Sequence, residues 1–127
     1  MILDSSAIVT VLLEETGYQV FFKKMERTTC AVGAPTLLEV AIVLRNRLRD
    51  DAREMIDGFL DAFEVEVIPF GTSHLSVAIQ GFNDYGKGRH PAKLNFGDCL
   101  TYAVAKVAGE PLLFKGNDFS QTDLLAA

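Results

Sequence analysis

The sequence has few of the residues that build disulfide frameworks or histidine-based metal centres, with only two cysteines and two histidines among 127 residues. Cys30 and Cys99 lie far apart and form no CxxC pair, so a disulfide scaffold is not expected. Both cysteines lie next to apolar residues, which favours buried thiols in a reducing compartment. His74 and His90 show no metal-ligand spacing. We expect one at a helix start and the other in a loop.

Targeting and membrane segments are missing from the sequence as well. The N-terminus has no basic stretch and reaches Asp4 within a few residues, so no signal peptide is expected. No apolar run approaches the roughly 18 residues that a membrane-spanning helix requires. We therefore expect a cytoplasmic protein without a membrane partner.

The common nucleotide-binding and hydrolase signatures are also absent. The chain contains no GxSxG, GxxxxGK[ST] or GxGxxG pattern. The pair Gly86 and Gly88 is too short to indicate a phosphate loop. An aspartate-nucleophile phosphatase needs a second aspartate two residues after the first, and Ser6 stands there instead. The third predicted strand ends in residues 69–71, Pro-Phe-Gly, where a phosphoacceptor receiver domain needs an aspartate.

What the chain does have is enough apolar sequence for one core. Hydrophobic residues make up 49% of it, and its length predicts one domain over residues 1–127. The net charge of −5 argues against a broad nucleic-acid-binding surface. Basic residues nevertheless gather in two runs. The first is Arg45, Arg47, Arg49 and Arg53; the second is Lys87, Arg89 and Lys93. Each run is either a local RNA-binding patch or ordinary solvated surface.

Short apolar runs alternate with segments of helical periodicity along the whole chain. We predict strands near residues 1–3, 29–32, 65–68 and 112–114. We predict helices near residues 5–13, 18–27, 35–48, 51–63, 72–82 and 95–107, with a polar loop over residues 84–91. This alternation favours βαβ crossovers and a parallel sheet covered on both faces, which is a three-layer α/β/α sandwich.

Four acidic residues fall where the carboxyl edge of that sheet should be, and ligands gather at this edge in open parallel folds. Asp4 ends the first strand, and Glu39 lies one turn into the helix after the second. Asp98 lies in the first turn of the helix that opens at Asn95, and Asp118 follows the fourth strand. Three have a structural alternative, since Asp4 could cap a helix, Asp98 could form a capping box with Asn95, and Asp118 could hold a turn.

Glu39 is the hardest of the four to explain as a structural residue. Its neighbours on the same helix face are Ile42 and Val43, and the opposite face is also apolar, so we expect the helix to be buried nearly all round. A carboxylate in such surroundings needs a cation or a hydrogen-bonding partner. Converging carboxylates raise one another's pKa, and a divalent cation removes that repulsion. Oxygen ligands alone select Mg²⁺ or Mn²⁺ over zinc, and these ions activate water and stabilise phosphodiester transition states.

Four segments of the chain resemble the motifs of PIN-domain ribonucleases. Residues 1–7, MILDSSA, resemble the opening of these domains, and residues 35–40, PTLLEV, resemble their second acidic motif. Residues 95–103, NFGDCLTYA, resemble the third and most specific motif, and residues 116–119, GNDF, resemble the fourth. The motifs occur in the family's order over essentially the whole chain. Its short length resembles that of VapC toxins from VapBC toxin–antitoxin modules.

The resemblance implies a four- or five-stranded parallel sheet and RNA cleavage that depends on Mg²⁺ or Mn²⁺. Asp4, Glu39 and Asp98 would form the metal-binding core. Asp118 would be a further metal ligand, or a group that supports the ligands without contacting the metal. The resemblance also implies a VapB-like antitoxin, a homodimer, and contact with DNA only through the antitoxin. Many members carry an acid where this chain has Gly116, which leaves open the number of metal ions and the role of Asp118.

The expected reaction is in-line attack of water on a phosphodiester, leaving 5′-phosphate and 3′-hydroxyl ends. Ser5, Ser6 and Thr101 either position water or phosphate, or are plain helix-cap and core-edge hydroxyls. Two other classes of function stay open. One is a binding module whose acidic cleft no longer cleaves, with Gly116 as its support. The other is a metal-dependent phosphatase acting on small phosphoesters.

Overall fold

The computed structural model describes all 127 residues and contains one four-stranded parallel sheet. The strands are β1 (Ile2–Leu3), β2 (Ala31–Gly33), β3 (Glu66–Ile68) and β4 (Leu112–Leu113). Their order across the sheet is β3-β2-β1-β4. The C-terminal tail extends this edge through a parallel bridge between Ala126 and Leu112. The predicted parallel sheet is therefore confirmed, with four strands and a bridge-length fifth element.

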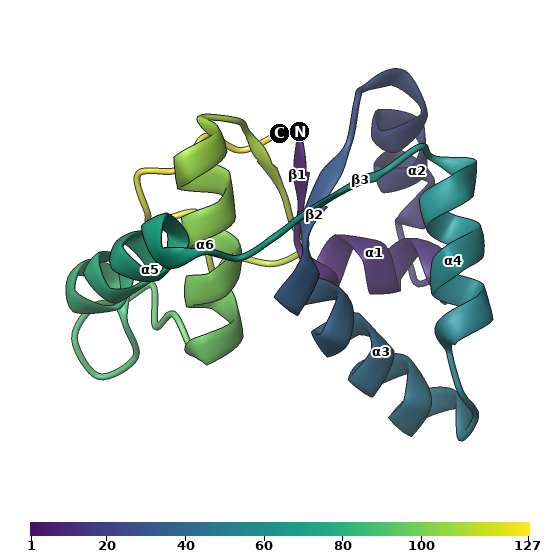
Figure 1. Cartoon of the computed structure of the whole chain (residues 1–127), viewed down its shortest axis with the longest axis horizontal. Helices are drawn as coiled ribbons and strands as arrows, with labels where there is room; N and C mark the ends of the chain where they lie inside the picture. The colour runs from purple at the N-terminus through teal and green to yellow at the C-terminus, as the bar shows by residue number, and fades with distance from the viewer.

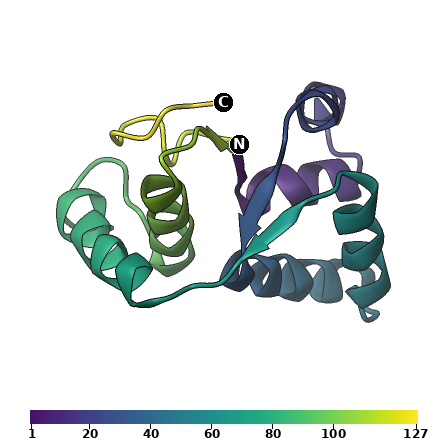
Figure 2. The ribbon, with the colours of Figure 1, turned by 45° about the horizontal axis from the view of Figure 1, so that its top comes forward.

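Six helices cover the two faces of the sheet. They are α1 (Ser5–Leu12), α2 (Tyr18–Arg27), α3 (Ala34–Leu48), α4 (Arg53–Ala62), α5 (Thr72–Tyr85) and α6 (Phe96–Ala108). Helices α1 to α4 lie on one side of the strands and α5 and α6 on the other, as both views show (Figure 1, Figure 2). This is the predicted three-layer α/β/α sandwich. None of the six helices has the length and apolar character needed to cross a membrane.

The strands separate two apolar cores because successive side chains of a strand point to opposite faces. Ile2 packs into the core beneath α6, whereas Leu3 packs into the core beneath α1 and α3. Leu112 and Leu113 divide in the same way. All four side chains are at most 2% exposed, so these short strands are buried on both faces, as a parallel sheet requires.

Local sequence signals explain where the helices that carry the acids begin and end. The Asp4 side chain accepts a hydrogen bond from the backbone N–H of Ser6 and caps α1. Asn95 caps α6, and Gly109 ends that helix in the left-handed conformation, with φ of 66°. Pro35 occupies the first turn of α3, where its missing N–H has no helical partner to lose.

Two expectations about the helices are wrong. Helix α5 continues to Tyr85 instead of ending near Phe82, because the Tyr85 carbonyl accepts a hydrogen bond from Leu94 N–H and its ring packs against Tyr102. Helix α3 is not buried all round, since Leu38 is 63% exposed and Ile42 is 52% exposed. These two side chains lie on a face of α3 that no other element covers.

Candidate active site

The four predicted acids converge at the carboxyl edge of the sheet. Strands β1 and β2 run to the same end, where α1 and α3 begin (Figure 1). Burial raises the pKa of Asp98 to about 6, and the charges of Asp118, Asp4 and Glu39 push it in the same direction, while a backbone hydrogen bond at Asn95 opposes them. Four segments that are distant in sequence therefore bring three carboxylates close enough for their charges to act on Asp98.

Asp4 is the most enclosed of the four acids, with 5% of its surface exposed. Its Oδ2 atom accepts hydrogen bonds from Ser6 N–H at 3.1 Å and from Ser6 Oγ at 2.5 Å. The helix-cap alternative for Asp4 is thus confirmed, while its charge still acts on Asp98. These two roles are compatible because capping uses a single carboxylate oxygen.

Ser6 also links Asp4 to the loop that carries Asp118. The backbone N–H of Lys115 donates a hydrogen bond to Ser6 Oγ at 3.0 Å, and that hydroxyl donates a hydrogen bond to Asp4. The loop after β4 is thereby fixed against the start of α1. Sequence reasoning treated Ser6 as a group for water or phosphate, or as a cap, and missed this positioning contact.

Glu39 obtains its hydrogen-bonding partner from α1. Ser5 Oγ donates to Glu39 Oε1, which joins the start of α1 to α3. The other oxygen, Oε2, lies against the backbone of Gly97, where a Cβ atom would overlap it. Because Gly97 has no side chain, the Glu39 carboxylate can lie beside the first turn of α6. Nothing in the sequence pattern singled out Gly97.

Asp98 forms the capping box that was its structural alternative. Its Oδ2 accepts from Asn95 N–H at 3.1 Å, and its own N–H donates to Asn95 Oδ1 at 2.9 Å. This arrangement fixes the carboxylate at the N-terminus of α6, where the helix dipole favours negative charge. The cap thus orients Asp98 toward the other acids instead of removing it from the site.

Thr101 has the structural role that the sequence left open. Its hydroxyl lies 3.2 Å from the hydroxyl of Thr36, and both residues are buried. This hydrogen bond joins α3 to α6 inside the protein. Thr101 is therefore a core hydroxyl that satisfies a buried polar partner, and it is not available to position phosphate.

The candidate metal ligands are carboxylates, and their chemistry fits a hard divalent cation. In this structure, however, no three acidic, histidine or cysteine side chains lie close enough together to hold a metal ion. Every donor at this edge is a carboxylate, and neither His74, His90 nor the two buried cysteines contributes. Oxygen donors of this kind suit Mg²⁺ or Mn²⁺. The raised pKa of Asp98 is the electrostatic cost that a cation would remove.

The PIN domain family model matches residues 1–125. The chain belongs to the PIN-domain family. It is 40% identical over 129 residues to Ribonuclease VapC42 of Mycobacterium tuberculosis, and the match covers all of this chain and 98% of that protein. This identity over the full length places the chain among the VapC-type members of the family.

Solved structures of very different sequence share this PIN fold. VapC20 of M. tuberculosis, a toxin that cleaves the sarcin–ricin loop, is 14% identical with a TM-score of 0.77, covering 99% of this chain and 97% of that one. VapBC2 from Rickettsia felis, bound to a DNA fragment from its promoter, is 15% identical with a TM-score of 0.71, covering 98% and 94%. Both confirm the α/β/α architecture.

An apolar hollow of about 460 Å³ adjoins the acids of this PIN domain between α3 and α6. Glu39 and Gly97 form its inner wall, while Leu38 and Ile42 form its outer wall. Phe96 stands at its rim with 81% of its surface exposed. An apolar surface of this kind beside a charged site is typical of a place where another molecule binds.

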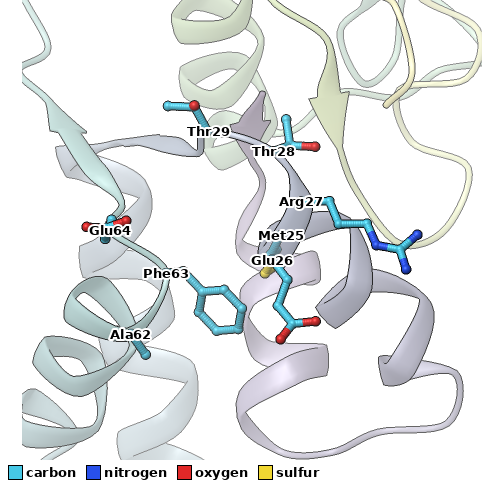
Figure 3. Close-up of a pocket in the computed structure, with 8 residues that line it drawn as sticks. All are labelled: Met25, Glu26, Arg27, Thr28, Thr29, Ala62, Phe63 and Glu64. Atoms are coloured by element: carbon cyan, nitrogen blue, oxygen red, sulfur yellow. The ribbon is translucent and has the colours of Figure 1, made fainter.

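A second hollow, of about 340 Å³, lies at the opposite edge of the sheet and plays no part in the site. It is formed by residues 25–29 and 62–64, which precede β2 and β3, and so lies at the amino ends of the strands. Figure 3 shows Phe63 pointing toward Met25 and Glu26, whereas the Arg27 guanidinium points away from them. Its lining contains two acids, Glu26 and Glu64, and neither is among the four predicted site residues.

Proposed function

We propose that this chain is a divalent-metal-dependent endoribonuclease and the toxin of a VapBC-type toxin–antitoxin module. The observation that carries the proposal is that three carboxylates, Asp118, Asp4 and Glu39, lie near enough to Asp98 for their charges to act on it. The family supports it, because the chain is 40% identical over its full length to a VapC ribonuclease. The absence of other catalytic signatures agrees with this assignment.

Asp4, Glu39 and Asp98 are the proposed ligands of Mg²⁺ or Mn²⁺. Asp118 joins them as a ligand or as a charge beside them, since among the charged neighbours it is the largest contributor to the raised pKa of Asp98. A bound divalent ion supplies Lewis acidity, which favours attack of water and offsets the charge that develops on the phosphate. Ser5 and Ser6 hold Glu39 and Asp4 in place.

The proposed substrate is an RNA phosphodiester, and the products are 5′-phosphate and 3′-hydroxyl ends. The carboxylates orient the reacting groups, and Asn95 and Gly97 fix the positions of Asp98 and Glu39 relative to each other. The buried free thiols agree with a cytoplasmic location, because thiols persist in a reducing compartment.

The proposed partners are a VapB-like antitoxin and a second copy of this chain. The antitoxin is suggested by the VapBC2 complex of R. felis, and it would be the component that contacts DNA. The exposed apolar side chains Leu38, Ile42 and Phe96 beside the acids offer a surface for a protein partner. Leu75 and Ile79, at helical spacing on α5 and each more than half exposed, offer a surface for a second copy.

The experiment that tests the activity compares RNA with a small phosphomonoester as substrates for the purified protein. Asp98→Asn serves as the control, because it removes the charge on which the other acids act and keeps the side-chain volume. We expect the wild type to cleave RNA in the presence of Mg²⁺ or Mn²⁺, and the variant to lose at least 100-fold of that rate, roughly 3 kcal/mol of transition-state stabilisation. Hydrolysis of the phosphomonoester alone would identify a phosphatase, and binding without cleavage would identify a binding module.

A further inference from the structure

Three charged residues from distant parts of the chain meet beside the proposed active site. Glu15 lies in the turn after α1, Arg47 in the last turn of α3, and Lys115 in the loop after β4. Glu15 Oε2 is 3.6 Å from Arg47 Nη1, and Glu15 Oε1 is 3.7 Å from Lys115 Nζ. Thr10, which is fully buried, donates a hydrogen bond to Glu15 Oε1 at 3.2 Å. We call these three residues the Glu15 cluster.

The Glu15 cluster leaves its cations with unused donors. At 3.6 and 3.7 Å the contacts with Glu15 are ion pairs and not hydrogen bonds, so the N–H groups of Arg47 and Lys115 remain free for another acceptor. The two cations outnumber the one anion, and their side chains are 58% and 42% exposed. Exposed ion pairs of this kind add little to stability, which makes a purely structural role a weak explanation.

The cluster borders a hollow of about 230 Å³ whose lining includes Ser5 and Ser6, the two serines that hydrogen-bond Glu39 and Asp4. Ser5 and Ser6 line this hollow together with Arg47 and Lys115. The same two serines donate to Glu39 and Asp4, and Ser6 accepts from the Lys115 backbone N–H. A ligand in the hollow would therefore lie one side chain away from the proposed metal ligands.

The other three arginines between residues 45 and 53 do not line the hollow beside Ser5 and Ser6. Arg45 lines a separate hollow between α3 and the start of α4, and Arg53 pairs with Asp51. Of the four arginines in that run, only Arg47 lines the hollow beside Ser5 and Ser6. The cationic run seen in the sequence is therefore not one surface: Arg45 and Arg47 belong to α3 and line different hollows, whereas Arg53 opens α4.

We propose that Arg47 and Lys115 bind a backbone phosphate of the RNA strand next to the phosphodiester that is cleaved, with Glu15 holding both cations in position. This inference rests on the proposed ribonuclease function. The Arg47 guanidinium presents a fork of N–H donors that matches two phosphate oxygens, and Lys115 adds a compact positive charge. The contact gives affinity and sets the position of the strand over the acids, and it does not read base sequence.

The test measures binding of a labelled single-stranded RNA of mixed sequence to the inactive Asp98→Asn protein across a salt series. The test variant adds Arg47→Gln and Lys115→Gln, and the matched control adds Arg45→Gln and Lys23→Gln, which removes the same charge elsewhere. We expect the test variant to bind about tenfold more weakly and to lower the slope of log affinity against log salt by roughly 0.7 to 1.4 units. The control should keep the slope of the parent.

The Arg47→Lys variant keeps a positive charge at this position but removes the forked N–H donors of the guanidinium. We expect this variant to bind more weakly than the parent with an unchanged salt slope, because the ion pair with phosphate survives while the paired hydrogen bonds do not. Equal affinity and slope in the test and control double variants would overturn the proposal. Unchanged RNA binding with weaker binding of an antitoxin would also overturn it, and would assign the cations to a protein partner.

The experiments distinguish failure of this inference from failure of the ribonuclease proposal. RNA binding is read in an inactive protein, whereas cleavage is read in the wild type. If the wild type cleaves RNA and the test double variant binds RNA like its control, only the phosphate-binding inference fails. If the wild type does not cleave RNA at all, the ribonuclease proposal fails regardless of the binding result.

Discussion

Asp98 has two roles: it forms the capping box of helix α6 with Asn95, and it lies near three other carboxylates whose charges act on it. Its pKa in the folded protein is about 6, above the ordinary value of 3.8, because of burial and the neighbouring acids. A group whose pKa is raised by folding stabilises the fold when protonated. Its contribution is therefore fully present below pH 3.8 and is lost as the pH rises through 6.

Asp98→Asn should stabilise the metal-free protein at neutral pH, because the amide carries no charge and its oxygen still accepts the hydrogen bond from Asn95. We expect a melting temperature roughly 3 to 5 °C above that of the wild type at pH 7, with the difference disappearing below pH 4. Thermal denaturation in the presence of a chelator, from pH 4 to 8, measures this. A variant that melts at or below the wild type at pH 7 would show that burial and the neighbouring acids do not make the charged Asp98 side chain unfavourable for folding.

Gly97→Ala tests whether the Glu39 carboxylate must lie against α6. The added Cβ would overlap Glu39 Oε2, which lies at the end of a flexible side chain and can move away. We expect the variant to fold and to lose at least tenfold of its RNA-cleaving rate. Gly58→Ala is the matched control, since it also replaces a helical glycine but meets no atom within 4 Å. Equal rates for both variants would mean that the position of Glu39 is not set by Gly97.

At the level of elements, the boundaries that could be predicted are those set by local chemistry. Asp4, Asn95 and Gly109 each mark a helix end through a cap or a left-handed residue, and the structure confirms all three. The last turn of α5 could not be predicted, because contacts of Tyr85 with Leu94 and Tyr102 hold it. The exposure of Leu38 could not be predicted either, since an apolar helix face looks the same whether or not a neighbour covers it.

In the candidate site too, features set by local sequence could be predicted, and those set by contacts between distant residues could not. The four acids could be found because each follows a predicted strand or opens a predicted helix, and parallel strands end at one edge. Their hydroxyl partners could not be assigned, since a serine after Asp4 looks equally like a helix cap. The contact from Ser6 to Lys115 joins residues that only the folded chain brings together. The Glu15 cluster was missed for the same reason.

The loop between α5 and α6 should contribute to RNA binding through Lys87, Arg89 and Lys93. The loop is closed at its base by hydrogen bonds between Lys87 and Leu94 and between Leu94 and Tyr85, and it leads directly into Asn95 at the start of α6. Arg89 lies over the Phe82 ring at 5.5 Å, which orders one of its three cations. The loop that carries these cations therefore leads directly into the turn that carries Asp98.

Neutralising all three loop cations should weaken RNA binding across sequences and lower the salt slope by roughly 0.7 unit for each lost phosphate contact. Affinity of the inactive Asp98→Asn protein for RNA in a salt series measures this, and binding of Mn²⁺ to the otherwise wild-type protein with and without the three substitutions should be unchanged. Unchanged RNA affinity and slope would assign the loop to solvent or to a protein partner.

At the scale of the whole molecule, the distribution of charge would allow an acidic protein to hold RNA. The net charge of −5 keeps nucleic acid off most of the surface, while cations stand on two sides of the proposed cleavage site. The Glu15 cluster lies on the side of α1, and the loop cations lie on the side of α6. The proposed divalent cation would bind to the four acids at the carboxyl edge of the sheet.

The most direct test of the central claim is RNA cleavage by metal-stripped protein before and after divalent ions are added back, with analysis of the product ends. We expect no cleavage in chelator, recovery with Mg²⁺ or Mn²⁺, and 5′-phosphate ends. Asp98→Asn, carried through the same preparation, should stay inactive with either ion, which excludes a contaminating nuclease. Full wild-type activity in the presence of chelator would contradict the claim that these four carboxylates act through a divalent metal.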